Sequence, residues 1–306
     1  MENSMTSKPA VRNLTQVMRQ HPLLFFFLMA YAFSWIMLIP YVLSVWGILP
    51  GDYTFTFVLN PFVGPTLAAF IMTGLTEGKA GIARLRLRIK QWRAGWQWYV
   101  FILLGIPVML LIGVVVMPGA LASFQGLKPL ILVSYPITFL AVFFGGGPLG
   151  EEIGWRGFAL PRLQARFGPL GGTLLLGILW VFWHLPHFLT PAQGGGPGTG
   201  LATFVTNFPI FTLMVLAMAI IFTWVFNHTR ASIFTAILTH AGINTPQLVW
   251  IPLFAALGVT SMNLAALVGF GVPALLIVIL TRGRLGYQPG QEQSLLPGAV
   301  EAQPAL

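Results

Sequence analysis

Long apolar segments recur along almost the whole chain, and each is long enough to cross a lipid bilayer. A window of about 20 apolar residues per span predicts helices at 23–48, 54–75, 96–117, 129–148, 170–189, 202–226, 231–250 and 252–281. Hydrophobic residues make up 56% of the chain and charged residues only 8%, as expected of a protein dissolved in lipid. The predicted fold class is all-α: a polytopic membrane protein with about eight transmembrane helices.

Basic residues are distributed over the short connectors between these spans. The formal net charge of +9 would also suit nucleic acid, but the sequence has no continuous basic patch, so we expect no nucleic-acid partner. The connectors on one side hold Lys8, Arg12, Arg19, Lys79, Arg84, Arg86, Arg88, Lys90, Arg93, Arg156, Arg162, Arg166, Arg230, Arg282 and Arg284, and only Lys128 falls on the other side. The positive-inside rule then predicts a multi-pass protein of the cell membrane with both termini in the cytoplasm.

The chain is predicted to hold one transmembrane domain. A cytoplasmic N-terminal segment at 1–22 precedes the domain at 23–282, and a tail at 283–306 that is poor in apolar residues is expected to be disordered. Within the first span, Ala30-Tyr31-Ala32 is a candidate signal-peptide cleavage site. The apolar run continues to Leu49, which favours a retained helix instead.

The connectors 77–95 and 190–200, and the absence of cysteine, lead to three further predictions. The segment 77–95 alternates apolar and basic residues and is expected to rest on anionic lipid headgroups. The segment 190–200 is rich in Gly and Pro and carries no charge, which is typical of a flexible external loop. The chain has no cysteine, which excludes disulfides, thiolate metal sites and a cysteine nucleophile.

Glu151, Glu152 and Arg156 stand close together in an otherwise apolar chain. Burying a charged side chain inside a membrane is costly, so such residues usually have a function. On a helix Glu152 and Arg156 are one turn apart, so they can form an ion pair that lowers the cost of burying both. Glu151 points about 100° away and is then an unpaired carboxylate suited to general-base chemistry. The alternative is an amphipathic cytoplasmic helix that follows 145–148 and continues to Arg166.

Three polar residues in later spans are candidates for the same site. His184 lies in an apolar span, with Trp180 one turn earlier where it could shield and orient the imidazole; the alternative is a bond from His184 to a neighbouring carbonyl. His187 is a weaker candidate beside the helix-ending Pro186. His240 and Asn244 are one turn apart on one face of a helix, where they could instead hold helices together. Polar residues from several helices can together build one site.

These motifs resemble a known family. The pattern Glu-Glu-x-x-x-Arg, an aromatic residue four positions before a histidine, and His-x-x-x-Asn, in this order, is similar to that of the CPBP family of intramembrane proteases, which includes CAAX prenyl endopeptidases and bacteriocin-processing or immunity proteins. The match runs from Gly145 to Gln247, with the core motifs within 145–250. Many relatives have phenylalanine where this chain has Trp180, and an aromatic side chain preserves the shielding role.

The resemblance implies transmembrane helices around a polar cavity open to the cytoplasmic side, and hydrolysis of a peptide bond. Glu151 would activate the attacking water with the help of His184, and His240 and Asn244 would stabilise the oxyanion. Glu152 and Arg156 would support this geometry, next to Trp180. A buried base and fixed donors are physically suited to this reaction.

A metal is the alternative to this mechanism. Glu151, His184 and His240 are acceptable zinc ligands, and the family has been described both as metalloproteases and as glutamate-dependent enzymes. The chain has no His-Glu-x-x-His motif, and we favour a mechanism without a cofactor.

Two other functions compete with an endopeptidase. The first is a non-catalytic immunity or peptide-binding protein, and the second is an ion-coupled transporter with Glu151 and His184 as a proton relay. The intact motifs favour the enzyme. A peptide or membrane-protein substrate and the lipid bilayer are the expected partners, and the sequence does not distinguish a prenylated substrate from others.

Overall fold

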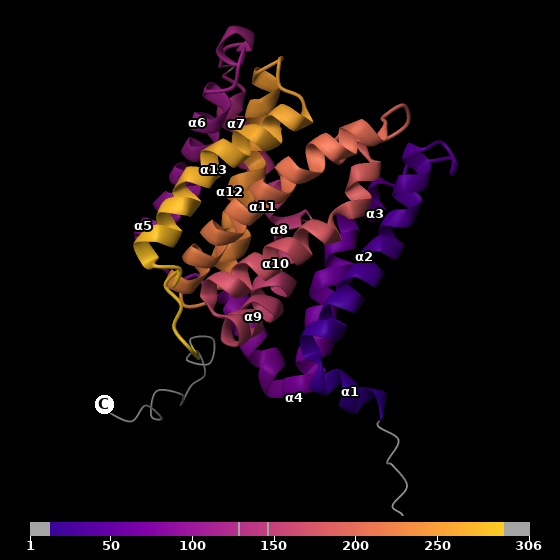
Figure 1. Cartoon of the computed structure of the whole chain (residues 1–306), viewed down its shortest axis with the longest axis vertical. Coiled ribbons are helices and arrows are strands. Elements are labelled where there is room, and N and C mark those ends of the chain that lie inside the picture. The colour runs from indigo at the N-terminus through magenta and orange to yellow at the C-terminus, as the bar shows by residue number, and fades with distance from the viewer. Residues whose placement is uncertain (1–12, 128, 146, 291–306) are drawn as a thin grey trace, which may run out of the picture.

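The computed structural model describes residues 13–127, 129–145 and 147–290, which form a bundle of helices (Figure 1). Seven helical segments within these ranges are long and apolar enough to cross a membrane. The predicted all-α polytopic membrane fold is therefore confirmed. Lys8, Arg12, Lys128 and residues 291–306 of the predicted tail lie outside the described residues.

The helices follow the chain in the order of their labels. They are α1 (Leu14–Gln20), α2 (Pro22–Val45), α3 (Thr54–Pro61), α4 (Leu67–Lys90), α5 (Trp96–Val100), α6 (Ile106–Val115), α7 (Ile131–Phe144), α8 (Gly147–Gly154), α9 (Leu160–Phe167), α10 (Pro169–Trp183), α11 (Leu201–His228), α12 (Ile233–Trp250) and α13 (Val259–Thr281). π-Helical turns at Phe62–Thr66, Phe101–Gly105 and Trp155–Ala159 join α3 to α4, α5 to α6 and α8 to α9. Such turns often occur at functional sites.

Each predicted span overlaps an observed helix, but the second continues past 75 to Lys90, the fourth ends at Phe144 and the fifth at Trp183. Two further spans also differ. The predicted 231–250 span is α12, which has 18 residues and is not among the seven membrane-length apolar segments. Its polar residues, among them Thr239, His240 and Asn244, make it less apolar than its neighbours. The last predicted span begins at Val259 instead of 252, because a short helical turn and the extended Gly258 precede α13.

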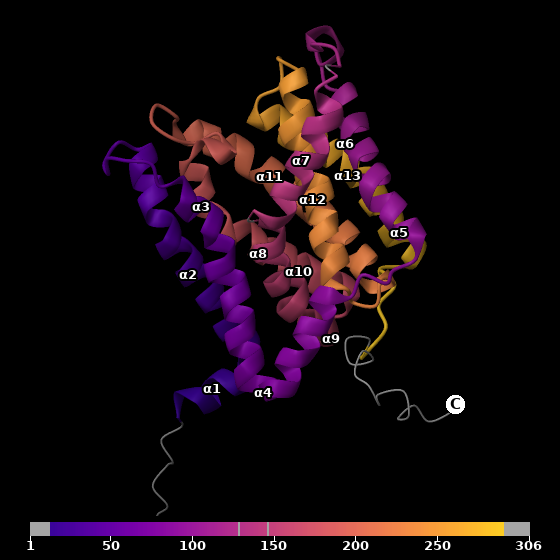
Figure 2. The same cartoon turned by 180° about the vertical axis from the view of Figure 1, so that it is seen from behind.

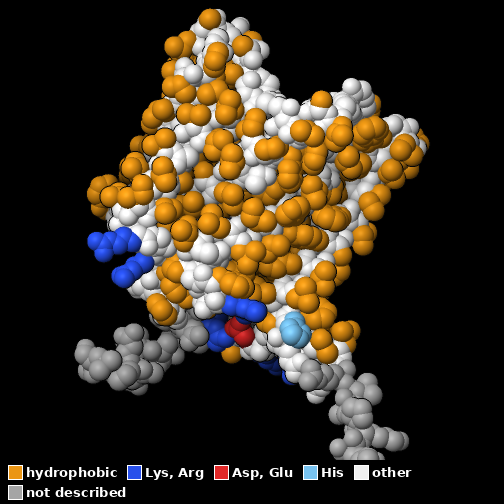
Figure 3. Space-filling model, in the orientation of Figure 1, with side chains coloured by type: hydrophobic (Ala, Val, Ile, Leu, Met, Phe, Trp, Pro, Cys, Tyr) orange, Lys and Arg blue, Asp and Glu red, His pale blue; other side chains and the backbone are white. Residues whose placement is uncertain are grey.

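One end of the bundle carries the basic side chains. Glu77 of α4 forms an ion pair with Arg162 of α9, and Asn227 at the end of α11 donates a hydrogen bond to the carbonyl of Leu285 at 3.0 Å. The Lys and Arg side chains visible in Figure 3 lie at this end, below a wall of hydrophobic side chains. We call it the basic end, and it comprises residues 14–20, 77–95, 157–168, 229–232 and 282–286.

Loops form the opposite end, which we call the loop end: residues 46–53, 184–200 and 251–258. Trp46 donates from its indole nitrogen to the carbonyl of Leu189 at 2.9 Å. Asn263, in the first turn of α13, donates to Gln193 Oε1 at 3.3 Å. These bonds join segments that are far apart in the sequence, and both views show the loops at the end away from α4 and α9 (Figure 2).

The loop at 190–200 is more ordered in its contacts than its composition suggests. It contains a short helical turn at Pro191–Gln193, and Thr190 and Gly196 within it are buried. The hydroxyl of Thr190 donates to the carbonyl of His187 at 2.8 Å. The loop therefore packs onto the end of α10.

Side chains of α2 bind to backbone carbonyls of α10. The Tyr31 hydroxyl donates to the carbonyl of Leu179, and the Trp35 indole donates to the carbonyl of Trp183 at 2.9 Å. A hydrogen bond of this kind satisfies both groups where lipid offers no partner. The bonds hold the end of α10, and hence His184, against the N-terminal part of the bundle.

The segment 77–95 differs from the expected headgroup-resting connector. It is helical as far as Lys90, and Arg88 is buried with 5% of its surface exposed. The Arg88 guanidinium donates to the carbonyls of Arg156, Gly157 and Ala231 at 2.9–3.0 Å. These carbonyls lie in the turn after α8 and in the turn before α12, so Arg88 ties both turns to α4.

Candidate active site

The polar residues singled out in the sequence meet at one cavity of about 500 Å³. Glu151 reaches it from α8, His184 from the end of α10, and His240 and Asn244 from α12. The remaining wall comes from α3, α7, α11, the start of α13 and the turn at 191–193. Residues that are far apart in the sequence thus form one site, and Glu152 and Arg156 lie directly behind it.

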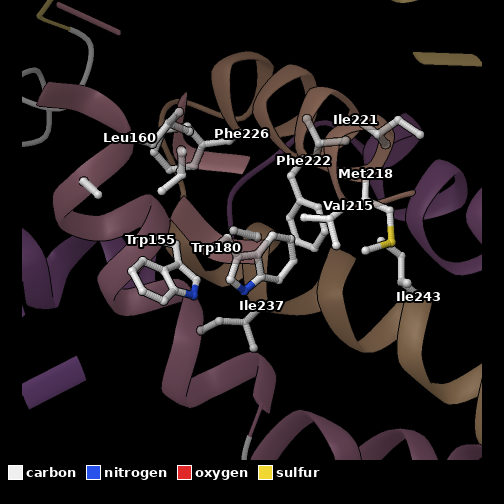
Figure 4. Close-up of a cluster of buried hydrophobic side chains, with 14 of the residues drawn as sticks. Trp155, Leu160, Trp180, Val215, Met218, Ile221, Phe222, Phe226, Ile237 and Ile243 are labelled. Atoms are coloured by element: carbon white, nitrogen blue, oxygen red, sulfur yellow. The ribbon is translucent and has the colours of Figure 1, made fainter. Parts of the chain in front are cut away.

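Glu151 is buried, with 5% of its surface exposed, and two indole groups hold its carboxylate. Trp180 donates to Oε2 at 2.7 Å and Trp155 donates to the same oxygen at 3.2 Å. Figure 4 shows the two indoles side by side with their nitrogens pointing the same way. The sequence analysis did not anticipate these two neutral donors: Trp155 lies one turn after Glu151, and Trp180 reaches it from α10.

Glu152 and Arg156 form the predicted ion pair at 3.0 Å, and both side chains are fully buried. The pair excludes the alternative of an amphipathic surface helix at these positions. The Arg156 guanidinium carbon lies 4.9 Å from the ring centre of Trp180 and 4.1 Å from that of Phe222, so aromatic faces also stabilise its charge. Glu152 Oε1 in addition contacts His240 Nδ1 at 2.8 Å.

His184 presents one ring nitrogen to the cavity. Its Nδ1 lies 2.8 Å from the carbonyl oxygen of Trp180, and because a carbonyl only accepts, Nδ1 carries the proton. Nε2 of the neutral ring then has a free lone pair. The bond to a neighbouring carbonyl, which was the alternative to a functional role, thus fixes the tautomer that a base or ligand requires.

The Trp180 ring lies between the two site histidines. Its centre is 5.7 Å from that of His184 and 5.6 Å from that of His240, both edge to face. His187, the weaker candidate, is buried in the cavity wall with its ring centre 5.1 Å from that of His184. It is therefore a wall residue of the site.

Gly147 at the start of α8 lies between Glu151 and Asn244. A methyl group placed on its Cα would be 3.3 Å from Glu151 Oε1 and 3.9 Å from Asn244 Nδ2. The carboxylate oxygen that the indoles leave free and the amide of Asn244 thus face one small space. The acceptor on Glu151 and the donor on Asn244 are the groups that would bind a water molecule and the oxygen of a reacting carbonyl in this space.

The cavity mouth lies at the loop end. Its inner wall is buried, at Trp180, Trp183 and His240, whereas Ala192 and Leu248 on its outer wall are exposed. The expectation that the cavity opens to the cytoplasmic side stays a prediction. The carboxylate of Glu151 lies in the bundle interior, behind these outer wall residues.

Several residues of the site escaped the sequence analysis. Trp155 and Trp183 look like ordinary core aromatics, and Asn60 of α3 lies outside the motifs. Asn60 Oδ1 and Trp183 Nε1 are buried in the cavity wall with no hydrogen-bond partner among the described residues. A polar residue in an apolar span is the signal that could have identified Asn60.

The glycines of α8 are a second signal that was missed. Gly150 and Gly154 are four residues apart, a spacing of small residues that lets membrane helices approach closely. A methyl on Gly154 would lie 2.5 Å from Pro65 Cβ and 2.7 Å from the Pro65 carbonyl oxygen. The two glycines therefore bring α8 against the π-helical turn after α3.

Zinc does not fit the residues observed. Among the described residues no group of three or more His, Cys, Asp or Glu side chains is arranged to hold a metal ion. Of the suggested ligands, Glu151 Oε2 accepts from two indoles and His240 Nδ1 contacts Glu152. We derive no step through a metal.

The comparison with known proteins agrees with the site geometry. Residues 133–246 match the family model described as type II CAAX prenyl endopeptidase Rce1-like. Over this segment the chain is similar to the CPBP family of intramembrane proteases. A relative named CAAX prenyl protease 2, from Methanococcus maripaludis, is 34% identical over 113 residues.

The matched segment contains every site residue predicted from the sequence and runs from α7 to α12. The alignment with the Methanococcus maripaludis relative covers 37% of this chain and 40% of the relative, so it spans less than half of either protein. The side chains of α2 that bind α10 lie outside the matched segment, and so does Arg88 of α4, which binds the carbonyls behind the site.

Proposed function

We propose that this protein is an intramembrane endopeptidase. The observation that carries the proposal is that Glu151, His184, His240 and Asn244 line one cavity, with Glu152 and Arg156 paired behind them. The match to CAAX prenyl endopeptidases supports the same reaction type. The substrate is a peptide or a segment of a membrane protein.

In this proposal Glu151 takes a proton from a water molecule, and the water oxygen attacks the peptide carbonyl carbon. Nε2 of His184 helps to orient the water. The carbonyl oxygen becomes an oxyanion that accepts from Asn244 Nδ2 and from Nε2 of a protonated His240, whose Nδ1 Glu152 holds. The C–N bond then breaks, the proton passes from Glu151 to the leaving amine, and a carboxyl group and an amine are released.

We also propose the orientation of the protein. The basic end faces the cytoplasm by the positive-inside rule, which places both termini there. The transmembrane domain at 23–282 would then carry the site, with 1–22 and 283–306 as cytoplasmic segments. The membrane in this proposal is the cell membrane.

Cleavage of a fluorogenic peptide library that includes prenylated members tests the activity. Purified wild type is compared with Glu151→Gln, and with Glu77→Gln as a matched control at the basic end. We expect cleavage by wild type and Glu77→Gln, and none by Glu151→Gln, with or without a chelator. Chelator-sensitive cleavage that zinc restores would contradict the metal-free mechanism.

The same variants separate an enzyme from a binding protein. A binding protein would cleave no peptide, and Glu151→Gln would keep the function of wild type in cells. That combination of results would contradict the proposed endopeptidase.

A further inference from the structure

A short turn of 3₁₀-helix carries His187 into the wall of the site cavity. Pro186 lacks the backbone N–H that would continue α10, and Leu185–Leu189 follow as a 3₁₀-helix. Such a helix has three residues per turn, so side chains at positions i and i+3 lie on the same face. His184 and His187 have this spacing, and both line the cavity.

Aromatic rings form a continuous row along this wall. Successive ring centres lie 5.6, 5.7, 5.1 and 5.2 Å apart in the order His240, Trp180, His184, His187 and Phe57. The row begins on α12 and ends on α3. His187 therefore lies on the α3 side of His184, whereas the proposed oxyanion donors lie on α12.

The imidazole of His187 has no assigned task in the reaction. The residue is buried, with 7% of its surface exposed, and its backbone N–H donates to the carbonyl of His184 at 2.9 Å. Its ring nitrogens have no hydrogen-bond partner among the described residues and are not fully enclosed, so they face the cavity that the ring lines. A neutral imidazole carries one donor and one acceptor, and both are available to a ligand.

Two neighbours of His187 also have an unused polar atom. The Trp183 ring centre lies 5.4 Å from that of His187, and Asn60 donates from Nδ2 to the carbonyl of Phe57 at 2.5 Å. Trp183 Nε1 and Asn60 Oδ1 have no partner among the described residues, and the wall encloses both atoms. Of these three side chains, His187 is therefore the one that can bind a ligand without a rearrangement of the wall.

A polypeptide backbone is a ligand that matches these groups. Each of its residues other than proline carries one N–H and one C=O, which need partners where water is excluded. An extended chain advances about 3.3–3.6 Å per residue, and the ring centres of His184 and His187 are 5.1 Å apart. A substrate cleaved beside His184 thus places backbone groups next to His187 one or two residues from the cleaved bond.

We propose that His187 is a substrate-binding residue that forms a hydrogen bond with the substrate backbone one or two residues from the cleaved bond. The assignment rests on the proposed endopeptidase activity. The bond is the same in the bound substrate and in the transition state, so it contributes to affinity and not to the chemical step. Because the partner is the backbone, the bond forms with substrates of different sequence.

Steady-state kinetics with the best library peptide test this assignment. His187→Phe keeps a ring against Phe57 and Trp183 and loses both nitrogens, whereas His187→Gln keeps a donor and an acceptor. Loss of one hydrogen bond should raise KM about 3- to 10-fold in His187→Phe and leave kcat within about 2-fold of wild type. His187→Gln should regain most of the affinity. His228→Phe, at an exposed histidine outside the cavity wall, is the control and should match wild type.

Peptides that contain one ester identify the bond itself. Replacing a backbone amide with an ester removes its N–H and weakens its carbonyl as an acceptor. Wild type should lose about 3- to 10-fold in kcat/KM for an ester at one position near the cleaved bond, and His187→Phe should lose nothing further there. If thermal unfolding shows that His187→Phe is destabilised, His187→Met, whose flexible side chain fills irregular gaps, takes its place.

The results separate this assignment from the activity on which it rests. An unchanged KM in His187→Phe, or equal ester losses in wild type and His187→Phe, overturns the assignment and leaves the endopeptidase intact. A loss of kcat in both His187→Phe and His187→Gln also overturns it, because His187 would then act in the chemical step. A wild type that cuts no library peptide contradicts the activity itself, and the assignment with it.

Discussion

Trp180 stands next to Glu151 in the cavity wall. In this chain the indole N–H donates to Glu151 Oε2 at 2.7 Å, a bond that a phenylalanine ring lacks. Trp180→Phe keeps an aromatic ring between His184 and His240 but loses this donor. A hydrogen bond to a charged group contributes about 1.5–3 kcal/mol, so we expect kcat/KM to fall about 10- to 100-fold. Steady-state kinetics with the best library peptide measure this.

A tryptophan outside the cavity provides the control for this change. Trp224 packs against Trp98 at a ring distance of 4.8 Å and does not line the cavity. Trp224→Phe should keep the wild-type kcat/KM. Unchanged kinetics in Trp180→Phe would show that Trp155 alone holds the carboxylate.

Glu152 and Arg156 allow a separation of stability from catalysis. Removing one partner of a buried ion pair leaves an uncompensated charge and costs about 3–5 kcal/mol, so Glu152→Ala should lower the free energy of unfolding by that amount. The double variant Glu152→Leu with Arg156→Met replaces the pair with apolar groups, which is often neutral. We expect it to regain most of the stability and to stay inactive, because His240 Nδ1 loses its partner. Thermal unfolding in detergent and peptide cleavage measure the two effects.

A double variant with restored activity would contradict this prediction. It would mean that His240 needs no bond at Nδ1 to act, and that Glu152 and Arg156 serve stability alone. Far-UV circular dichroism of each variant confirms that an inactive protein is still helical.

At the scale of the element, α8 has one glycine that faces the cavity and another that faces a helix. A methyl on Gly147 enters the space between Glu151 Oε1 and Asn244 Nδ2, whereas a methyl on Gly154 collides with the backbone at Pro65. We expect Gly147→Ala to keep its stability and lose at least about 10-fold in activity. Gly154→Ala should lose about 1–3 kcal/mol of stability through overpacking.

The two variants are controls for each other, since the substitution is the same and the helix is the same. Thermal unfolding and peptide cleavage are measured for both. A stable and fully active Gly147→Ala would contradict a reaction space beside this glycine.

The sequence predicts elements well where one physical rule decides them. Apolar length identifies the spans, and helical spacing identifies the Glu152–Arg156 pair, because both depend on local geometry. The bond from Trp180 to Glu151 joins residues 29 positions apart and depends on how α8 and α10 pack. The same holds for Arg88, whose place in a basic segment suggests headgroups but whose partners are carbonyls of distant turns.

At the scale of the whole molecule, the site depends on parts outside the matched segment. Arg88 of α4 donates to carbonyls in the turn that carries Arg156 and in the turn before α12. Arg88→Lys keeps the charge but replaces a planar fork of donors with one ammonium. We expect a loss of about 2 kcal/mol in stability from carbonyls left without partners, measured by thermal unfolding. Arg86→Lys, at an exposed position on the same helix, is the control and should unfold like wild type.

The sequence does not predict at which end of the bundle the cavity opens. That depends on how the ends of several helices pack around Glu151 in three dimensions. Ala192 lies at the rim in the loop after α10, so a bulky group there should close the entrance. We expect purified Ala192→Cys to be active and to lose at least about 10-fold in kcat/KM after reaction with a large maleimide, with little change for labelled Ala83→Cys, at an exposed position of the basic end. Mass spectrometry confirms complete labelling. Full activity of completely labelled Ala192→Cys would mean that substrate enters elsewhere, for example sideways between α3 and α7, and would move the entrance from the loop end to the lipid-facing wall.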